Sequence, residues 1–402
     1  MTQSIRSSKT SKAKTIKTTV MHVAVLAVMS TAVIGCNRGI KPVVNDPVKL
    51  VQIAQPISVL QPVFSTDVGN KKASKKDPLD LQVGYTNEQI VTASRGGELT
   101  GFNNTGERLW SVNVDEQITG GVALDALSQT AIISTRSGKI MAFDSATGEK
   151  RWQQQLSGSV LTPALITNNR VVLSANNGFL HGLSLQTGQS VWQFATQVPA
   201  ISVRGSAAPT LLDSKTALLA TADGRLHAVT ADNGLPQWSR RVGVGAGSSE
   251  VERMSDVDGA PIVDKNQMFA ISYSGQLLGI DLASRQVMFV NEQASLKALA
   301  VNTQQVIATG LDGKVVAYDR NTGAVLWESE ELAYRHLTNP VMIGNYIAVG
   351  DLDGVVHLFD PASGKIVSRV ETKGALSSLQ VQGSRLMTQS TSGQVAIWQL
   401  AR

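Results

Sequence analysis

The chain has 402 residues, 42% hydrophobic and 17% charged, and its 36 basic and 31 acidic residues give a net charge of +5. Residues 1–35 hold five of the bases and no acid, so the rest of the chain is neutral, which excludes the basic surplus typical of nucleic-acid-binding proteins. Because Cys36 is the only cysteine, an intramolecular disulfide is excluded as well.

The N-terminus has the pattern of a secretory signal peptide over residues 1–35. The basic segment is followed by an apolar stretch from Val20 to Val28, which is shorter than the ~20 residues that a membrane-spanning helix needs. The stretch ends in a Val33-Ile34-Gly35-Cys36 sequence that resembles the lipobox of bacterial lipoproteins. This resemblance implies cleavage before Cys36, lipid attachment to that cysteine and, because Asn37 follows it, anchoring at the periplasmic face of the outer membrane. The alternative is a cysteine that follows an apolar run by chance.

Residues 36–56 separate this anchor from the folded region, which we expect over 57–402. They contain Pro42, Pro47 and Pro56 among scattered charges, and no repeat. This composition predicts a flexible tether.

From there to the C-terminus one pattern returns about every 40 residues, which indicates an array of small units. Its clearest form, A-x-D-x-x-T-G-x-x-x-W, occurs at Ala142–Trp152 and at Ala317–Trp327. Five looser copies complete a set of seven: Gly97–Trp110, Gly178–Trp192, Gly224–Trp238, Gly275–Phe289 and Gly354–Ser368.

Each copy predicts four short antiparallel strands, illustrated by residues 163–166, 170–175, 179–184 and 189–195, with Asn and Gly at the turns between them. We expect Asp144 to accept backbone N–H groups two residues on, Gly148 to take the left-handed conformation, and the Trp ring to pack between neighbouring units.

An eighth copy is incomplete, since Ser392–Leu400 opens like the others and the chain then ends. The run Pro62–Gly69 resembles the missing segment, with Phe64 at the Trp position. We therefore predict an all-β, eight-bladed β-propeller with four antiparallel strands per blade, closed by the N- and C-terminal strands.

Two successive copies are longer than the others. The additional residues lie at 198–205 and at 243–259, each directly after a Trp-bearing strand. Because such connections leave the ring at one end of the blades, both should lie on the same face and on adjacent blades. Long insertions that carry apolar residues, Arg204 and several acids on a rigid scaffold are typical of a protein interface.

Motifs for catalysis or cofactor binding are absent. The sequence contains no C-x-x-C, H-E-x-x-H, G-x-S-x-G or Walker-type loop. Asp256–Gly259 matches half of a calcium loop, without the third oxygen ligand and the distal Glu. We predict no enzyme activity, no metal site and no cofactor.

The repeat resembles those of two families, the eight-bladed pyrroloquinoline-quinone (PQQ) dehydrogenases and the BamB lipoproteins of the outer-membrane β-barrel assembly (BAM) machinery. The dehydrogenases have an adjacent cysteine pair and calcium ligands, neither of which occurs here. The segments I-S-V-R-G (201–205) and E-V-E-R-M-S-D-V-D (250–258) are similar to the BamB segments L-S-L-R-G and E-x-x-R-x-S-D-V-D.

This resemblance implies a scaffold that binds the periplasmic POTRA domains of the barrel protein BamA and assists insertion of outer-membrane proteins. The implied contact residues are Ile201, Val203, Arg204, Asp256 and Asp258. Two alternatives to direct contact stay open: Arg204 and the aspartates pair to brace the two loops, or the chain is a PQQ-dependent enzyme. A further hypothesis is that the unpaired outer blade edges receive strands of unfolded outer-membrane proteins.

Overall fold

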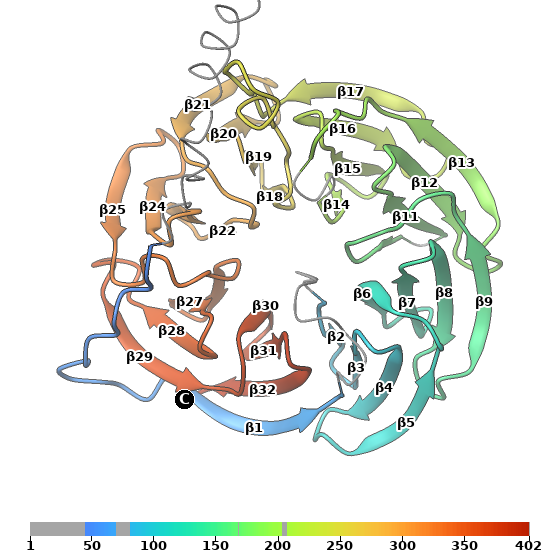
Figure 1. Ribbon diagram of the computed structural model, residues 1–402, viewed down its shortest axis with the longest axis horizontal. Coiled ribbons are helices and arrows are strands. Elements are labelled where there is room, and N and C mark those ends of the chain that lie inside the picture. The colour runs from blue at the N-terminus through green and yellow to red at the C-terminus, as the bar shows by residue number, and fades with distance from the viewer. Residues whose placement is uncertain (1–44, 70–80, 168, 203–206, 402) are drawn as a thin grey trace, which may run out of the picture. The chain divides into compact units, whose positions relative to one another are not determined.

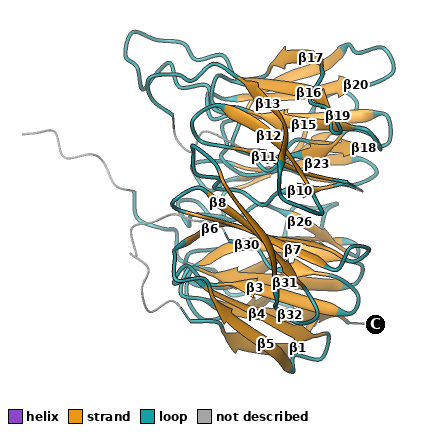
Figure 2. Cartoon of the chain, turned by 90° about the vertical axis from the view of Figure 1, so that its right-hand side faces the viewer, coloured by secondary structure: helices purple, strands orange, loops and turns teal. Residues whose placement is uncertain are grey.

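The computed structural model describes residues 45–69, 81–167, 169–202 and 207–401. Residues 46–402 form one compact unit, and apart from Asn45 the other unit, residues 1–45, lies outside the described residues. The unit contains eight four-stranded antiparallel sheets arranged around a centre (Figure 1). In the side view the described residues are drawn as strands joined by loops and turns (Figure 2). The prediction of an eight-bladed propeller is confirmed. Among the described residues, no helix is long and apolar enough to span a membrane.

Seven of the eight blades are built from consecutive strands. Blades one to four comprise β2 (Gly84–Tyr85), β3 (Gln89–Ala93), β4 (Glu98–Asn103) and β5 (Arg108–Asn113); β6 (Ile118–Asp125), β7 (Thr130–Thr135), β8 (Lys139–Asp144) and β9 (Lys150–Gln155); β10 (Leu165–Ile166), β11 (Arg170–Ser174), β12 (Phe179–Ser184) and β13 (Ser190–Ala195); β14 (Thr210–Leu211), β15 (Thr216–Ala220), β16 (Arg225–Thr230) and β17 (Pro236–Arg241).

Blades five to seven continue the series, and blade eight takes strands from both ends of the chain. They comprise β18 (Ile262–Asp264), β19 (Gln267–Ile271), β20 (Gln276–Asp281) and β21 (Val287–Glu292); β22 (Ala300–Val301), β23 (Gln305–Thr309), β24 (Val315–Asp319) and β25 (Val325–Ser329); β26 (Val341–Ile343), β27 (Tyr346–Gly350), β28 (Val355–Phe359) and β29 (Ile366–Glu371); β30 (Leu376–Gln382), β31 (Arg385–Ser390), β32 (Gln394–Leu400) and β1 (Leu60–Asp67).

Within each blade the first strand is innermost and the fourth lies on the circumference (Figure 1). The second and third strands are buried on both sides, because they are covered by the neighbouring blades. The fourth strand alternates between buried and exposed positions, as in β13. Each blade therefore has one edge that faces outwards.

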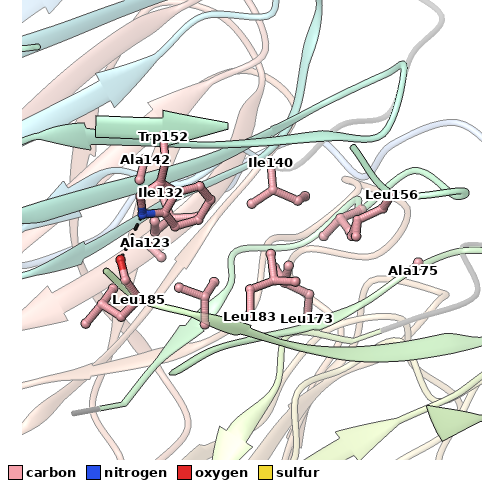
Figure 3. Close-up of a cluster of buried hydrophobic side chains, with 12 residues drawn as sticks. Ala123, Ile132, Ile140, Ala142, Trp152, Leu156, Leu173, Ala175, Leu183 and Leu185 are labelled. Carbon is pink, nitrogen blue, oxygen red and sulfur yellow. Dashed lines mark hydrogen bonds between the residues drawn. The ribbon is translucent and has the colours of Figure 1, made fainter. Parts of the chain in front are cut away.

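The contact between neighbouring blades is a ring placed on a glycine, as seen between blades two and three (Figure 3). Nε1 of Trp152 donates to the carbonyl oxygen of Leu185 at 2.8 Å, and a Cβ added to Gly188 would lie 2.4 Å from the ring. Only glycine permits this approach, and its φ of 72° suits the turn. Equivalent pairs are Trp110 with Gly148, Trp192 with Gly234, Phe289 with Gly323, Trp327 with Gly364 and Phe64 with Gly106.

Two details of the repeat are confirmed. Oδ1 of Asp144 accepts the backbone N–H groups of Ala146 and Thr147, both at 2.9 Å. Strand β1 pairs antiparallel with β32, from Leu60 opposite Leu400 to Asp67 opposite Gln394, so the ring is closed by both ends of the chain.

The second half of the expected tether differs from the prediction. The backbone N–H of Val48 donates to Ala333 at 3.1 Å, and that of Ile57 donates to Val367 at 3.0 Å. Leu50 and Ile53 pack against the core between blades six and seven. Two apolar side chains and these hydrogen bonds hold residues 48–57 along the propeller.

Candidate partner-binding surface

The two long connections leave the ring at the same end of adjacent blades. The first, residues 196–209, joins β13 to β14, and the second, residues 242–261, joins β17 to β18. Each begins with a hydrogen bond to the turn between the second and third strands of its blade: Thr196 N to the oxygen of Gly178 at 2.9 Å, and Val242 N to that of Gly224 at 2.8 Å. The loops therefore share one face of the disc, as the sequence predicts, which we call the loop face.

The first connection exposes apolar side chains before it returns to the core. Val198 is 55% exposed and Ile201 44% exposed, whereas Ala207 is fully buried. Val203 and Arg204, both predicted as contact residues, lie outside the described residues. Of the predicted residues in this connection, Ile201 can therefore be placed on the surface.

The second connection consists of two arms that lie directly against each other beside blade five (Figure 1, yellow). A Cβ added to Gly243 would lie 2.0 Å from the oxygen of Ser255, and one added to Gly245 would lie 2.1 Å from that of Arg253. The glycine-rich run therefore allows close packing of the two arms.

The tip of this connection is a capped turn. Glu252 accepts the backbone N–H groups of Ser248 and Ser249 at 2.9 and 3.0 Å, and its own N–H donates to Oγ of Ser249 at 3.2 Å. This reciprocal pairing is a capping box. It fixes Val251, which is 58% exposed, at the end of the loop.

The base of the second connection is anchored on blade five. The N–H of Val244 donates to Oε1 of Gln276 at 2.9 Å, and the oxygen of Asp256 accepts the N–H of Tyr273 at 2.8 Å. Val257 is fully buried in the core between blades four and five. Asp256 and Asp258 flank it and are themselves 0% and 7% exposed.

The structure thus separates the predicted contact residues into two groups. Asp256 and Asp258 are buried, at 0% and 7% exposure, whereas Arg204, with which they would pair in the bracing alternative, lies outside the described residues. The large apolar side chains that the described parts of the two connections expose are Ile201 and three valines that were not among the predicted contact residues. We call this set of four, Val198, Ile201, Val244 and Val251, the loop surface. The omitted valines occur within or beside the predicted segments, and exposure distinguishes them from Val257.

At the centre of the loop face a small depression marks the end of the channel. Its volume is about 100 Å³, and both connections contribute to its lining through Ala208 and Asp258. Cofactor sites enclose roughly 300 Å³ or more. The depression is smaller than such sites, and the described residues contain no cluster of three His, Cys, Asp or Glu that could hold a metal ion.

Comparisons with known proteins agree with the geometry. A family model described as "Outer membrane protein assembly factor BamB" matches residues 95–329 and 311–401. The protein of that name from Yersinia pestis is 26% identical over 347 residues, which cover 83% of this chain and 87% of the relative. The crystal structure of BamB from Moraxella catarrhalis is 45% identical, with a TM-score of 0.80 over 85% of this chain and all of the other. A quinohemoprotein alcohol dehydrogenase from Pseudomonas putida, 11% identical with a TM-score of 0.64 over 88% of this chain and 78% of its own, shares the fold alone.

Proposed function

Because this chain belongs to the family of the outer membrane protein assembly factor BamB, we propose that it is a non-catalytic scaffold that binds the barrel protein of the assembly machinery through the loop surface. The partner would be the periplasmic POTRA domains of BamA within the BAM complex. By holding these domains in position, the scaffold would assist insertion of outer-membrane proteins.

The observation that carries this proposal is the exposure of four apolar side chains on two adjacent connections. Val198, Ile201, Val244 and Val251 are each 44 to 58% exposed, and their loops are fixed to rigid blades. Apolar anchors of this kind, surrounded by polar groups such as the Arg253 and Glu250 ion pair at 3.0 Å, are typical of interface centres. Preformed loops also reduce the ordering cost of binding.

Arg204, Val203, Asp256 and Asp258 would contribute to partner binding in two different roles. The buried aspartates would hold the base of the second loop, so their replacement would weaken partner binding by moving the loop. Val203 and Arg204 come two and three residues after Ile201 in the first loop and would extend the contact area. A double-mutant cycle between Arg204→Ala and Asp258→Ala, read by pull-down, distinguishes bracing from independent contact.

Membrane attachment would come from Cys36 after removal of residues 1–35. The apolar run before this cysteine supports the proposal, as does the family to which the chain belongs. Cys36→Ser should move the protein from the membrane fraction to the soluble periplasm. If this variant stayed with the outer membrane, the anchor would be elsewhere.

The partner proposal is tested by pull-down of the barrel protein from solubilised membranes. Ile201→Asp combined with Val251→Asp should abolish recovery, because each change places a charge at the centre of an apolar contact. The matched control is Leu127→Asp: Leu127 is 91% exposed in the connection between β6 and β7, at the opposite end of the blades. Undiminished recovery with the double variant, at unchanged thermal stability, would contradict the proposal.

The quinoprotein alternative is tested directly by adding PQQ and calcium and following dye reduction with alcohols or sugars. We expect none, because the sequence has neither the adjacent cysteine pair nor the calcium ligands of the quinoprotein dehydrogenases. A secondary role is also proposed: the outward edges of the fourth strands, whose backbone groups are unpaired, would bind strands of unfolded outer-membrane proteins. Proline placed in an outer strand should weaken peptide binding if that role exists.

A further inference from the structure

The contact between blades four and five departs from the ring-on-glycine pattern. Six rings, from Phe64 to Trp327, pack against a glycine in the turn of the next blade. The equivalent turn of blade five has Arg285 at that place, with a φ of 57°. In blade three, a Cβ added to the equivalent Gly188 would lie 2.4 Å from the ring of Trp152. Arg285 carries such a Cβ. Arg285 therefore prevents Trp238 from packing flat on the turn.

Trp238 consequently lacks the hydrogen bond that its counterparts make. Trp110, Trp152, Trp192 and Trp327 each donate from Nε1 to a carbonyl oxygen of the next blade, at 2.6 to 2.8 Å. Within the described part of the chain, Nε1 of Trp238 makes no hydrogen bond, and the side chain is only partly buried. A donor and a ring face that are used elsewhere in the fold are left available here.

A cavity of about 370 Å³ opens beside this ring. Its floor is apolar, formed by Trp238 with Leu212, Met268, Ile280 and Leu282. Its volume falls within the range of about 300 to 1,000 Å³ that small-ligand sites occupy. At the other six ring positions the ring lies against the glycine of the next blade.

The rim of the cavity is cationic. Arg240 and Arg285 both line it, and Nη2 of Arg240 donates to the backbone oxygen of Arg285 at 2.9 Å. The one carboxylate in the lining, Asp213, already accepts the backbone N–H groups of Lys215 and Thr216, both at 2.8 Å. The side chain of Arg285 has no partner among the described residues, so one guanidinium remains for a ligand.

We propose that this cavity binds a peptide segment in which an aromatic or large aliphatic side chain lies next to a carboxylate. The apolar side chain enters the space against Trp238, and the carboxylate pairs with Arg285 and Arg240. A peptide is favoured over a small molecule because the cavity lies along β17, whose outer edge has unpaired backbone groups that can bind an extended chain.

The site is separate from the loop surface. Leu282 and Arg285 belong to the turn between β20 and β21, and Leu212 and Asp213 follow β14. These turns lie at the end of the blades opposite to the long connections. The inference therefore does not depend on the proposed partner, and both sites can be occupied at once.

The test uses the six tryptophan indole signals of 15N-labelled full-length protein, with Trp238→Phe to assign the signal of interest. The probe is a Ser/Thr hexapeptide with a central Phe-Asp pair, compared with Phe-Lys and Ala-Asp versions. We expect a saturable shift of the Trp238 signal with Phe-Asp and none with the other two peptides.

Two variants of Arg285 distinguish the contribution of the open cavity to peptide binding from that of the guanidinium charge. Arg285→Ala keeps a Cβ and the open cavity, and should weaken binding by about tenfold or more. Arg285→Gly restores the turn of the other blades, so Trp238 should close onto it and donate to the oxygen of Leu282. Peptide binding is then lost, and the indole N–H gains protection from hydrogen exchange.

No shift of the wild-type signal, or an equal response of Arg285→Gly to the Phe-Asp peptide, would overturn the proposal. An equal response to the Phe-Lys peptide would also overturn it, because the cationic rim must discriminate between the two. A shift produced by an alkyl detergent, with no discrimination among the peptides, would assign the cavity to a lipid chain instead.

Discussion

Replacement of Asp351 by alanine should destabilise the propeller strongly, because this buried carboxylate accepts four hydrogen bonds. Oδ2 accepts from Nε of Arg335 at 2.8 Å and from Nε2 of His357 at 3.0 Å, and Oδ1 accepts from the N–H groups of Asp353 and Val355 at 3.0 and 2.9 Å. Asp351 and His357 are fully buried, and Arg335 is 4% exposed. The variant leaves the buried guanidinium of Arg335 without its buried carboxylate, so that only the exposed Asp353 still pairs with it.

The expected cost is about 3 to 5 kcal/mol, the range found when one partner of a buried ion pair is removed. Asp353→Ala provides a matched control, since Asp353 pairs with the same arginine but its side chain is 57% exposed. Exposed pairs contribute about 1 kcal/mol or less. Urea unfolding at pH 7.5 measures both, and a cost of Asp351→Ala equal to that of Asp353→Ala would refute the reasoning.

The same replacement should release the N-terminal segment. Nη1 of Arg335 also donates to the carbonyl oxygen of Val48 at 2.9 Å, so its position supports residues 48–57. Burial raises the pKa of Asp351, but hydrogen bonds from His357, Val355 and Arg335 outweigh this and lower it to about 2. The stabilisation by Asp351 is therefore present above pH 4 and is lost as the pH falls towards 2.

The release of residues 48–57 can be measured by limited proteolysis, because cleavage near Val48 should increase in Asp351→Ala.

Two further predictions concern single positions in the blades. Burial lowers the pKa of His181 to about 4, so the wild type should lose roughly 2 kcal/mol between pH 8 and 5 as the unfolded chain takes up the proton. His181→Met, which copies Met141 of blade two, should remove this loss, and an equal decrease in both proteins would contradict it. Gly188→Ala should cost roughly 2 to 4 kcal/mol in urea unfolding, because its Cβ would meet Trp152 at 2.4 Å. Gly383→Ala, at a φ of 59° with nothing within 4 Å, should cost only about 1 kcal/mol; equal costs would refute the steric argument.

Most of the fold could be predicted from the sequence because the repeat encodes both the turn and the contact between blades. The D-x-x-T-G turn and the ring eight residues after its Asp are local signals, and each occurs several times in the chain. The closing strand can also be predicted from the sequence, since Phe64 stands at the ring position of the incomplete copy. In the structure its ring packs on Gly106.

Features that depend on long-range contacts outside the repeat could not be predicted. Residues 48–57 have no repeat, and their binding depends on Arg335 and Arg369, which lie far away in the sequence and donate to Val48 and Val51. The sequence predicts Asp256 and Asp258 as surface contacts, whereas both are buried in the structure. The apolar Val257 between them is a signal for burial, but the same residue could also occur in an exposed loop.

The most direct measurement for the central claim is site-specific photo-crosslinking in intact cells. A photoreactive residue at Ile201 on the loop surface is compared with one at Leu127, which is exposed at the opposite end of the blades. The account predicts an adduct with the barrel protein from position 201 and none from position 127. An adduct from position 127 alone would contradict it.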